Sequence, residues 1–146
     1  MITANQVCTF FLDKQMYGVD VQSVQEVIRY QDMTDVPLAP DSVVGLINLR
    51  GQIVTAIDLR KRLGLPCRPE GQLPMNVVIQ SNDEAISLLV DQIGDVQEFD
   101  IEHFEAPPET LRGVSRNMIC GAYKMKHRLL LILDTERALA VSSVND

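Results

Sequence analysis

Short runs of apolar residues separated by polar turns dominate the chain, and the clearest pair lies at residues 46–49 and 53–57. The tripeptide Arg-Gly-Gln separates these runs, and a glycine there tolerates the positive φ that a hairpin turn needs. Asp58 follows the second run and Gly64 comes six residues later. Since an aspartate can cap the start of a helix and a glycine its end, the stretch predicts strand, turn, strand and a short helix.

The pattern elsewhere predicts further hairpins, one within residues 7–19 and one within residues 76–90. A short helix is expected after Asp20, because apolar residues then recur at three- and four-residue spacing. Its apolar positions would be Val21, Val24 and Ile28. Residues 95–109 are acidic and end near prolines, so we expect a solvated loop there.

A later part of the chain repeats the opening hairpin at a constant offset of 76 residues. The apolar run 53–57 corresponds to residues 129–133, and Asp58 corresponds to Asp134. Matched features in a matched order indicate two similar β units. The turn itself is not repeated, because Leu49-Arg50-Gly51 is replaced by Met-Lys-His and the turn glycine is lost. This difference predicts that the first turn has a role beyond folding.

The repeat predicts one domain, residues 1–146, made of two subdomains. The first would span about residues 7–66 and the second about residues 76–141, with a linker rich in proline and glycine at residues 67–75. Short strands, frequent polar turns and few helical patterns favour two small barrels, each of about five strands, over an open sheet.

Composition and charge narrow the possible functions. The chain has 146 residues, of which 46% are hydrophobic and 23% charged, as in ordinary globular proteins. Its formal charge of −7 argues against nucleic acid or an anionic membrane as the main partner. The longest purely apolar run, residues 129–133, is too short to span a bilayer, and no secretory signal is recognised. We expect a cytoplasmic protein.

Residues that could carry out chemistry are sparse. The three cysteines are widely spaced and neither histidine lies in a metal-binding motif, so buried or half-buried structural thiols are expected. Motifs for phosphate loops, dinucleotide binding and activated serines do not occur. Asp58 and Asp134 match in the repeat and are interpreted as helix caps, not as a catalytic pair. The sequence therefore predicts no enzyme, no cofactor and no metal.

The chain resembles the CheW family of chemotaxis coupling proteins. The resemblance rests mainly on Gly45-x-x-Asn48-Leu49-Arg50-Gly51-x-Ile53, followed by Asp58-Leu59-Arg60. Shorter motifs support it in the same order along the chain: Tyr17-Gly18-Val19-Asp20, Val24-Gln25-Glu26, Val36-Pro37 and Val90-Asp91. It covers about residues 7–140 and implies two packed SH3-like barrels of five strands each, with short helices.

The resemblance also implies a non-enzymatic adaptor that links the cytoplasmic tips of chemoreceptors to the regulatory domain of a CheA-type histidine kinase. It would be a monomer alone, join a larger array, and have no nucleic-acid partner and no segment inserted in the membrane. The receptor would dock in the groove between the barrels, and the kinase would bind the outer side of the first. Implied receptor-binding residues are Glu26, Asn48, Arg50, Gly51, Val77 and Val96. Implied kinase-binding residues are Val21 and Val24, on the short helix.

Two positions depart from the family pattern. Thr55 stands where many members have proline, and Ser87, expected near the groove, stands where many have glycine. Three alternative functions are an adaptor of a parallel chemosensory pathway, a module that competes with the main coupler, and a small-ligand-binding double barrel. Binding to a CheA regulatory domain would distinguish the adaptor functions from small-ligand binding.

Overall fold

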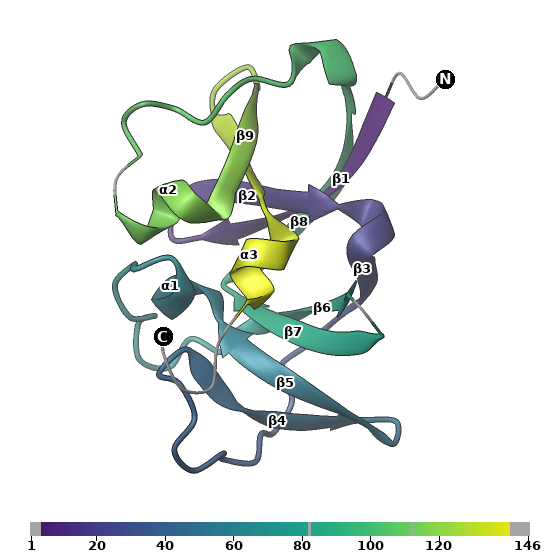
Figure 1. The fold of residues 1–146 in the computed structure, drawn as a ribbon, viewed down its shortest axis with the longest axis vertical. Coiled ribbons are helices and arrows are strands. Elements are labelled where there is room, and N and C mark those ends of the chain that lie inside the picture. The colour runs from purple at the N-terminus through teal and green to yellow at the C-terminus, as the bar shows by residue number, and fades with distance from the viewer. Residues whose placement is uncertain (1–3, 82, 112, 141–146) are drawn as a thin grey trace.

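The computed structural model describes residues 4–81, 83–111 and 113–140, within which two five-stranded sheets each curl into a small barrel (Figure 1). Barrel A contains β1 (Ala4–Leu12), β2 (Gln15–Asp20), β8 (Gln92–Asp100), β9 (Ile119–Lys124) and β10 (Leu129–Leu133), in the order β8-β1-β2-β10-β9. Barrel B contains β3 (Val24–Ile28), β4 (Val43–Leu49), β5 (Gln52–Asp58), β6 (Met75–Ser81) and β7 (Glu84–Val90), in the order β3-β6-β7-β5-β4. The helices are short: η1 (Val21–Ser23), α1 (Leu59–Arg62), η2 (Ile101–His103), α2 (Val114–Met118) and α3 (Thr135–Leu139). The predicted all-β fold of two SH3-like barrels is confirmed.

The repeat found in the sequence is also a repeat of structure. The units β4-β5-α1 and β9-β10-α3 correspond, and each helix is capped by the matched aspartate. The Asp58 side chain accepts a bond from the Arg60 N–H at 3.1 Å, and Asp134 accepts one from the Arg137 N–H at 3.2 Å. The interpretation of both aspartates as caps is therefore confirmed.

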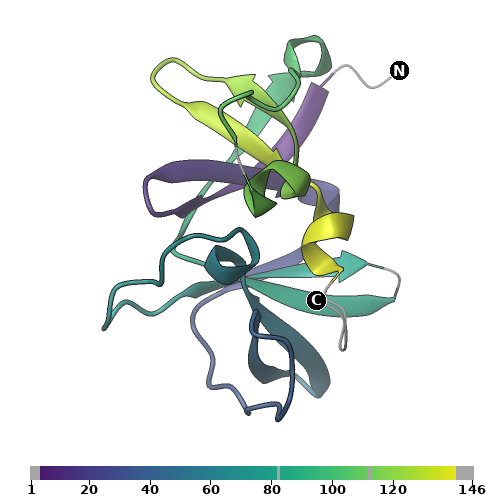
Figure 2. The same ribbon diagram turned by 60° about the vertical axis from the view of Figure 1, so that its left-hand side comes forward.

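The subdomain boundaries predicted from the repeat, residues 7–66 and 76–141, do not match the barrels. β1 and β2 join β8, β9 and β10 from the second half of the chain, while β6 and β7 join the strands of the first half. The chain crosses between barrels at η1 and again at Asp91, between β7 and β8 (Figures 1 and 2). Because β1 pairs with β2 on one side and β8 on the other, each barrel requires strands from both repeats.

The main hydrophobic core is shared by the two barrels. Its fully buried members include Phe10 and Leu12 from barrel A and Leu88 from barrel B. At the same junction, the Arg62 guanidinium of α1 donates to the carbonyl oxygens of Arg137, Ala138 and Ala140, at the end of α3, over 2.9 to 3.1 Å. A cation at this position interacts favourably with the carbonyl oxygens at the C-terminal end of a helix. The two barrels thus form one domain.

Three local predictions need correction. The helix expected after Asp20 is a single 3₁₀ turn, after which the β-branched segment Val24–Ile28 pairs with β6 as a strand. The solvated loop expected at residues 95–109 begins later, because β8 extends to Asp100 along β1. Cys67 and Cys120 are exposed, so the expected burial of thiols holds for Cys8 alone.

The exchange of strands makes a prediction about folding. A fragment of residues 1–66 contains β1 to β5 but lacks β8, which pairs with β1, and β6, which pairs with β3, so it should not unfold cooperatively by itself. Circular dichroism during urea titration would test this, with the whole chain as the control. Mixing this fragment with residues 67–146 should restore a cooperative transition. A fragment of residues 1–66 that unfolds cooperatively alone would contradict the exchange.

Candidate functional site

The turn between β4 and β5 is the most distinctive feature of barrel B. Leu49 pairs with Gln52 across two turn residues, Arg50 at φ +50° and Gly51 at φ +88°. Two successive positive φ values define a type I′ turn, which matches the twist of a hairpin. The Gly51 N–H donates to the Asn48 side-chain oxygen over 2.9 Å. Asn48 and Gly51 therefore hold the backbone that presents Arg50.

An ion pair fixes this turn to the neighbouring edge of the barrel. The Arg50 guanidinium donates to the Glu26 carboxylate of β3, and the Arg50 side chain is 72% exposed whereas that of Glu26 is 20% exposed. A weaker contact joins the Gln25 and Gln52 side-chain amides at 3.4 Å. A pair with so exposed a partner contributes only about 0.2–1 kcal/mol to stability. Glu26 thus orients a cation that faces solvent.

The corresponding loop of barrel A is built differently. β9 ends at Lys124 and β10 begins at Leu129, and the Met125 N–H bonds to the Arg128 carbonyl over 2.8 Å. The tight turn of barrel B is thus replaced by a longer loop, as the loss of the glycine predicted. Lys126 occupies the position that corresponds to Arg50, and its side chain is exposed.

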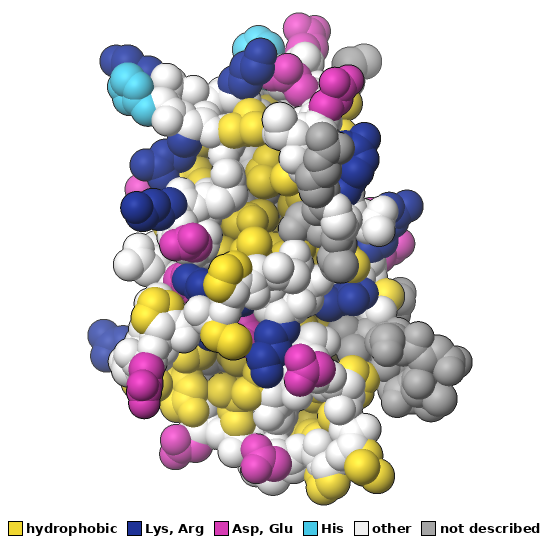
Figure 3. Space-filling model, turned by 90° about the vertical axis from the view of Figure 1, so that its left-hand side faces the viewer, with side chains coloured by type: hydrophobic (Ala, Val, Ile, Leu, Met, Phe, Trp, Pro, Cys, Tyr) yellow, Lys and Arg dark blue, Asp and Glu magenta, His cyan; other side chains and the backbone are white. Residues whose placement is uncertain are grey.

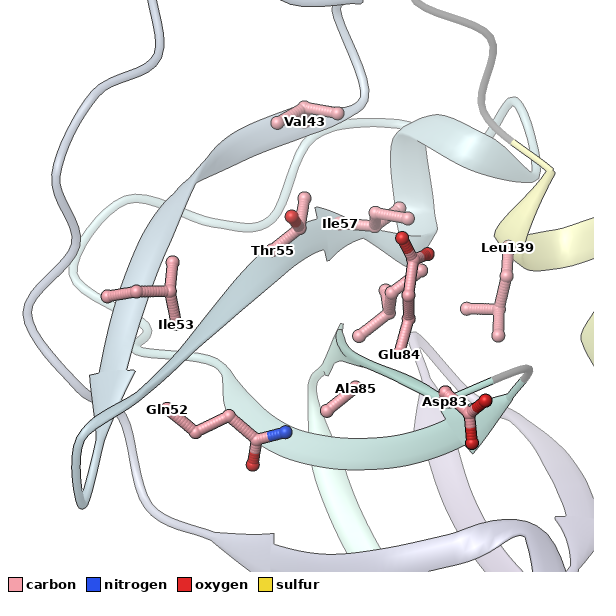
Figure 4. A pocket seen from close by; sticks show the side chains of 10 residues that line it. Val43, Gln52, Ile53, Thr55, Ile57, Asp83, Glu84, Ala85 and Leu139 are labelled. Carbon is pink, nitrogen blue, oxygen red and sulfur yellow. The ribbon is translucent and has the colours of Figure 1, made fainter.

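A groove opens beside the turn, along β5 and β7, with the last residue of α3 on its far side (Figure 4). The parallel register pairs Thr55 with Ile86, which places Glu84 beside Ile53 near the turn end of β5. Ile53 is 61% exposed, an unusual state for a large apolar side chain next to other apolar groups. Residues that line the groove are Val43, Gln52, Ile53, Thr55, Ile57, Asp83, Glu84, Ala85, Ile86 and Leu139. Apolar side chains interspersed with polar and acidic ones suit one face of an amphipathic helix.

The structure separates the other implied binding residues. Val77 is completely buried in the shared core, so the expectation that it contacts a receptor is wrong: its side chain points into the barrel. Val96 is 55% exposed on β8 but does not line the groove. Val21 and Val24 are both partly buried, and Val24 packs against the core. Because they lie on η1 and at the start of β3, they do not lie on one helix face.

The two departures from the family pattern also lie apart. Thr55 lines the groove, where its side chain is accessible to a ligand. Ser87 is completely buried, and its hydroxyl donates to the Asn76 side-chain oxygen over 2.7 Å. The Asn76 amide in turn donates to the Arg29 carbonyl over 2.9 Å. Ser87 therefore supports β3 and β6 from inside and takes no part in the groove surface.

A buried ion cluster around Asp91 was not predicted from the sequence. The Asp91 carboxylate accepts bonds from the Arg60 guanidinium, from Arg68 Nε over 2.9 Å and from the Asp13 N–H over 2.7 Å. Burial by itself would raise the pKa of Asp91, but these hydrogen bonds outweigh it and hold the pKa below the ordinary value. The hydrogen bond to Asp91 likewise raises the pKa of Arg60.

One sequence signal did point to Asp91. The pair Val90-Asp91 echoes Val19-Asp20, and both aspartates follow a second strand at the points where the chain leaves one barrel for the other. Asp20 is exposed and caps η1, whereas Asp91 is buried and binds groups from three segments. The repeated Val-Asp pair showed that Asp20 and Asp91 occupy equivalent positions, but only the tertiary structure brings Arg60 and Arg68 to Asp91.

Charges on one face of the molecule are mixed. Figure 3 shows an apolar area along the middle of this face with Lys, Arg, Asp and Glu side chains interspersed around it. In the described part of the chain, no three His, Cys, Asp or Glu side chains are grouped so that they could hold a metal ion. Nor do residues 4–81, 83–111 and 113–140 include a helix with the length and apolar character to cross a membrane.

Comparison with known proteins gives a consistent result. The family model described as "CheW-like domain" matches residues 6–143. The chain is 30% identical to chemotaxis protein CheW of Treponema pallidum, over 90% of this chain and 80% of the relative. It is also 30% identical to chemotaxis protein CheW of Bacillus subtilis, over 94% and 88%. The crystal structure of the scaffolding protein TtCheW from Thermoanaerobacter tengcongensis superposes with a TM-score of 0.85 at 26% identity, covering 97% of this chain and 96% of the other.

The ion cluster makes a prediction about stability. Asp91→Asn should lower the free energy of unfolding by about 3–5 kcal/mol, because the buried Arg60 loses its counter-charge and Arg68 keeps only its ion pair with Asp58, at 3.6 Å. A carboxylate whose pKa is lowered in the folded state stabilises it above the ordinary aspartate pKa, about 3.9, and this contribution is lost as the pH falls further. Urea unfolding between pH 7 and pH 3 should therefore show a steeper acid loss for the parent than for Asp91→Asn.

Asp20→Asn is the matched control for this variant. Asp20 occupies the equivalent position in the repeat but is exposed, and asparagine caps a helix about as well as aspartate. Its free energy of unfolding should change by less than about 1 kcal/mol. Equal effects of Asp91→Asn and Asp20→Asn would contradict the special role of the cluster.

Proposed function

The chain belongs to the CheW-like domain family, and from this premise we propose that it is a chemotaxis adaptor that couples chemoreceptors to a CheA-type histidine kinase. The family is one of scaffolds and not of catalysts. The observation that carries the proposal is the position of Arg50, held outward by Glu26 beside a groove to which both barrels contribute. In this role the protein acts by binding alone, in the cytoplasm, at receptor arrays.

The groove accounts for receptor binding in this proposal. A receptor hairpin presents helices, and an amphipathic helix would place apolar residues against Ile53 and Leu139. Arg50 stands two residues from the groove and offers the unused donors of its guanidinium, which has five. An acidic side chain on the receptor helix would satisfy them. The chain would then hold receptor and kinase together, so that a change in one biases the other.

Arg50→Ala tests the receptor contact. We expect the affinity for a purified receptor cytoplasmic fragment to fall at least about fivefold, because an interface arginine is often a hot spot. The melting temperature should change little, since the ion pair with Glu26 is exposed. Co-sedimentation and thermal unfolding measure the two quantities. A large drop in melting temperature would instead show that Arg50 has a structural role.

Lys126→Ala is the control for Arg50→Ala. Lys126 is the equivalent exposed cation in the other repeat, so this variant removes the same charge without touching the groove. Receptor affinity should be unchanged. If both variants weaken binding equally, the effect comes from net charge and not from the site.

Val21→Asp tests the kinase contact. A carboxylate in an apolar interface loses its hydration without gaining a partner, so binding to a purified kinase regulatory domain should fall sharply while receptor binding remains. Gln22→Asp, at the exposed neighbouring position, is the control for added charge. Normal kinase binding by Val21→Asp in calorimetry would show that this surface is assigned wrongly.

A further inference from the structure

The loop between β3 and β4 exposes a leucine in an unfavourable backbone conformation. The Leu38 side chain is 100% exposed, and its φ is +63°. The Ala39 N–H donates to the Val36 carbonyl over 3.4 Å, so residues 36–39 form a turn with Pro37 at its second position. This is the pattern of a type II turn, whose third position favours glycine or asparagine. A leucine there brings its Cβ close to the following carbonyl oxygen.

The turn is held in place from both sides. Thr34 and Leu46 exchange two backbone hydrogen bonds of 2.9 and 2.8 Å, and the Val43 N–H donates to the Pro40 carbonyl over 2.9 Å. Prolines at positions 37 and 40 restrict the backbone further. These restraints hold the backbone on both sides of Leu38, which lowers the backbone entropy lost when a partner binds it. Strain and complete exposure at one apolar residue together favour a functional explanation.

The charges around the tip indicate what it can bind. Asp32, Asp35 and Asp41 lie in the same loop and are exposed. Among the described residues, the one ion pair found for these three joins Asp41 to Lys61 at 3.9 Å. An apolar tip among carboxylates is complementary to an apolar pocket with a basic rim. A second copy of this chain fits poorly, because its groove carries Asp83 and Glu84 and the chain has a net charge of −7.

The position of the loop separates it from the turn that carries Arg50, although Val43, the residue that begins β4 after the loop, lines one end of the groove. In Figures 1 and 2 the β3–β4 loop lies at the opposite end of β4 from the turn that carries Arg50. Of the two partners in the proposed function, a coiled-coil receptor buries its apolar seam between its own helices. A folded domain can offer a pocket instead. We propose that Leu38 inserts into an apolar pocket, rimmed by basic side chains, on the regulatory domain of the kinase. This inference rests on the proposed adaptor function.

Leu38→Asn tests it without endangering the fold. Asparagine adopts positive φ readily, so the melting temperature should rise, by about 3 °C. Affinity for the purified kinase regulatory domain should fall about tenfold or more, because burial of the leucine is lost. Affinity for the receptor fragment should not change. Leu73→Asn is the matched control, since Leu73 is also a largely exposed leucine, at 64%, but lies in the linker between α1 and β6.

The remaining outcomes each decide the question. Unchanged kinase affinity of Leu38→Asn would overturn the inference and leave the adaptor function standing, whereas failure of the parent chain to bind the kinase domain would overturn both. A change in sedimentation of the protein alone, with unchanged kinase affinity, would make a second copy the occupant instead. Replacing Asp32, Asp35 and Asp41 by Asn should weaken kinase binding and reduce its salt dependence. Tighter binding by that variant would contradict the basic rim.

Discussion

The buried carboxylate of Asp91 is the constraint on which the arrangement of the barrels depends. It sits where the chain passes from β7 to β8, and it binds the β1–β2 turn through Asp13, α1 through Arg60 and the linker through Arg68. Charged groups removed from water need partners of opposite sign and saturated hydrogen bonding. These partners exist only when both barrels are formed and correctly placed. The cluster thus makes one relative placement of the barrels much more favourable than others.

The exchange of strands between repeats has a consequence for the candidate site. Barrel B holds the turn with Arg50 and both strands along the groove, while Leu139 reaches the groove from α3, which follows the last strand of barrel A. Arg62 fastens α1 to the end of the same helix. A groove built in this way has a shape that depends on how the barrels pack. The affinity of a ligand for the groove would therefore depend on the relative position of the barrels, and its binding would favour one such position.

The two repeats share scaffold and differ in what they expose. Both keep the strand pair and the aspartate that caps the following helix. Only the first keeps the type I′ turn, in which Arg50 adopts a positive φ, and its loop before β4 carries a leucine with the same property. Asp13 and Asp83 also have positive φ, but aspartate adopts it more readily than arginine or leucine does. Arg50 and Leu38 both lie on barrel B at opposite ends of β4. Binding features are thus concentrated at the ends of one barrel, where hydrogen bonds to neighbouring strands hold the loops.

The hairpins, the two helices capped by Asp58 and Asp134 and the two-barrel class could be predicted from the sequence, because apolar alternation, turn glycines and capping aspartates act over a few residues. Through the family resemblance the sequence also indicated Glu26 and Arg50 as candidate binding residues, and these two form an ion pair in the structure. It did not determine which repeat contributes to which barrel, because self-similarity shows which segments are alike and not which strands pair. It misplaced Val77, since apolar residues on a strand look the same whether they face a groove or the core. The tertiary structure alone decided these points, together with the cluster at Asp91, because pairing, burial and charge contacts between distant segments arise only when the chain is folded.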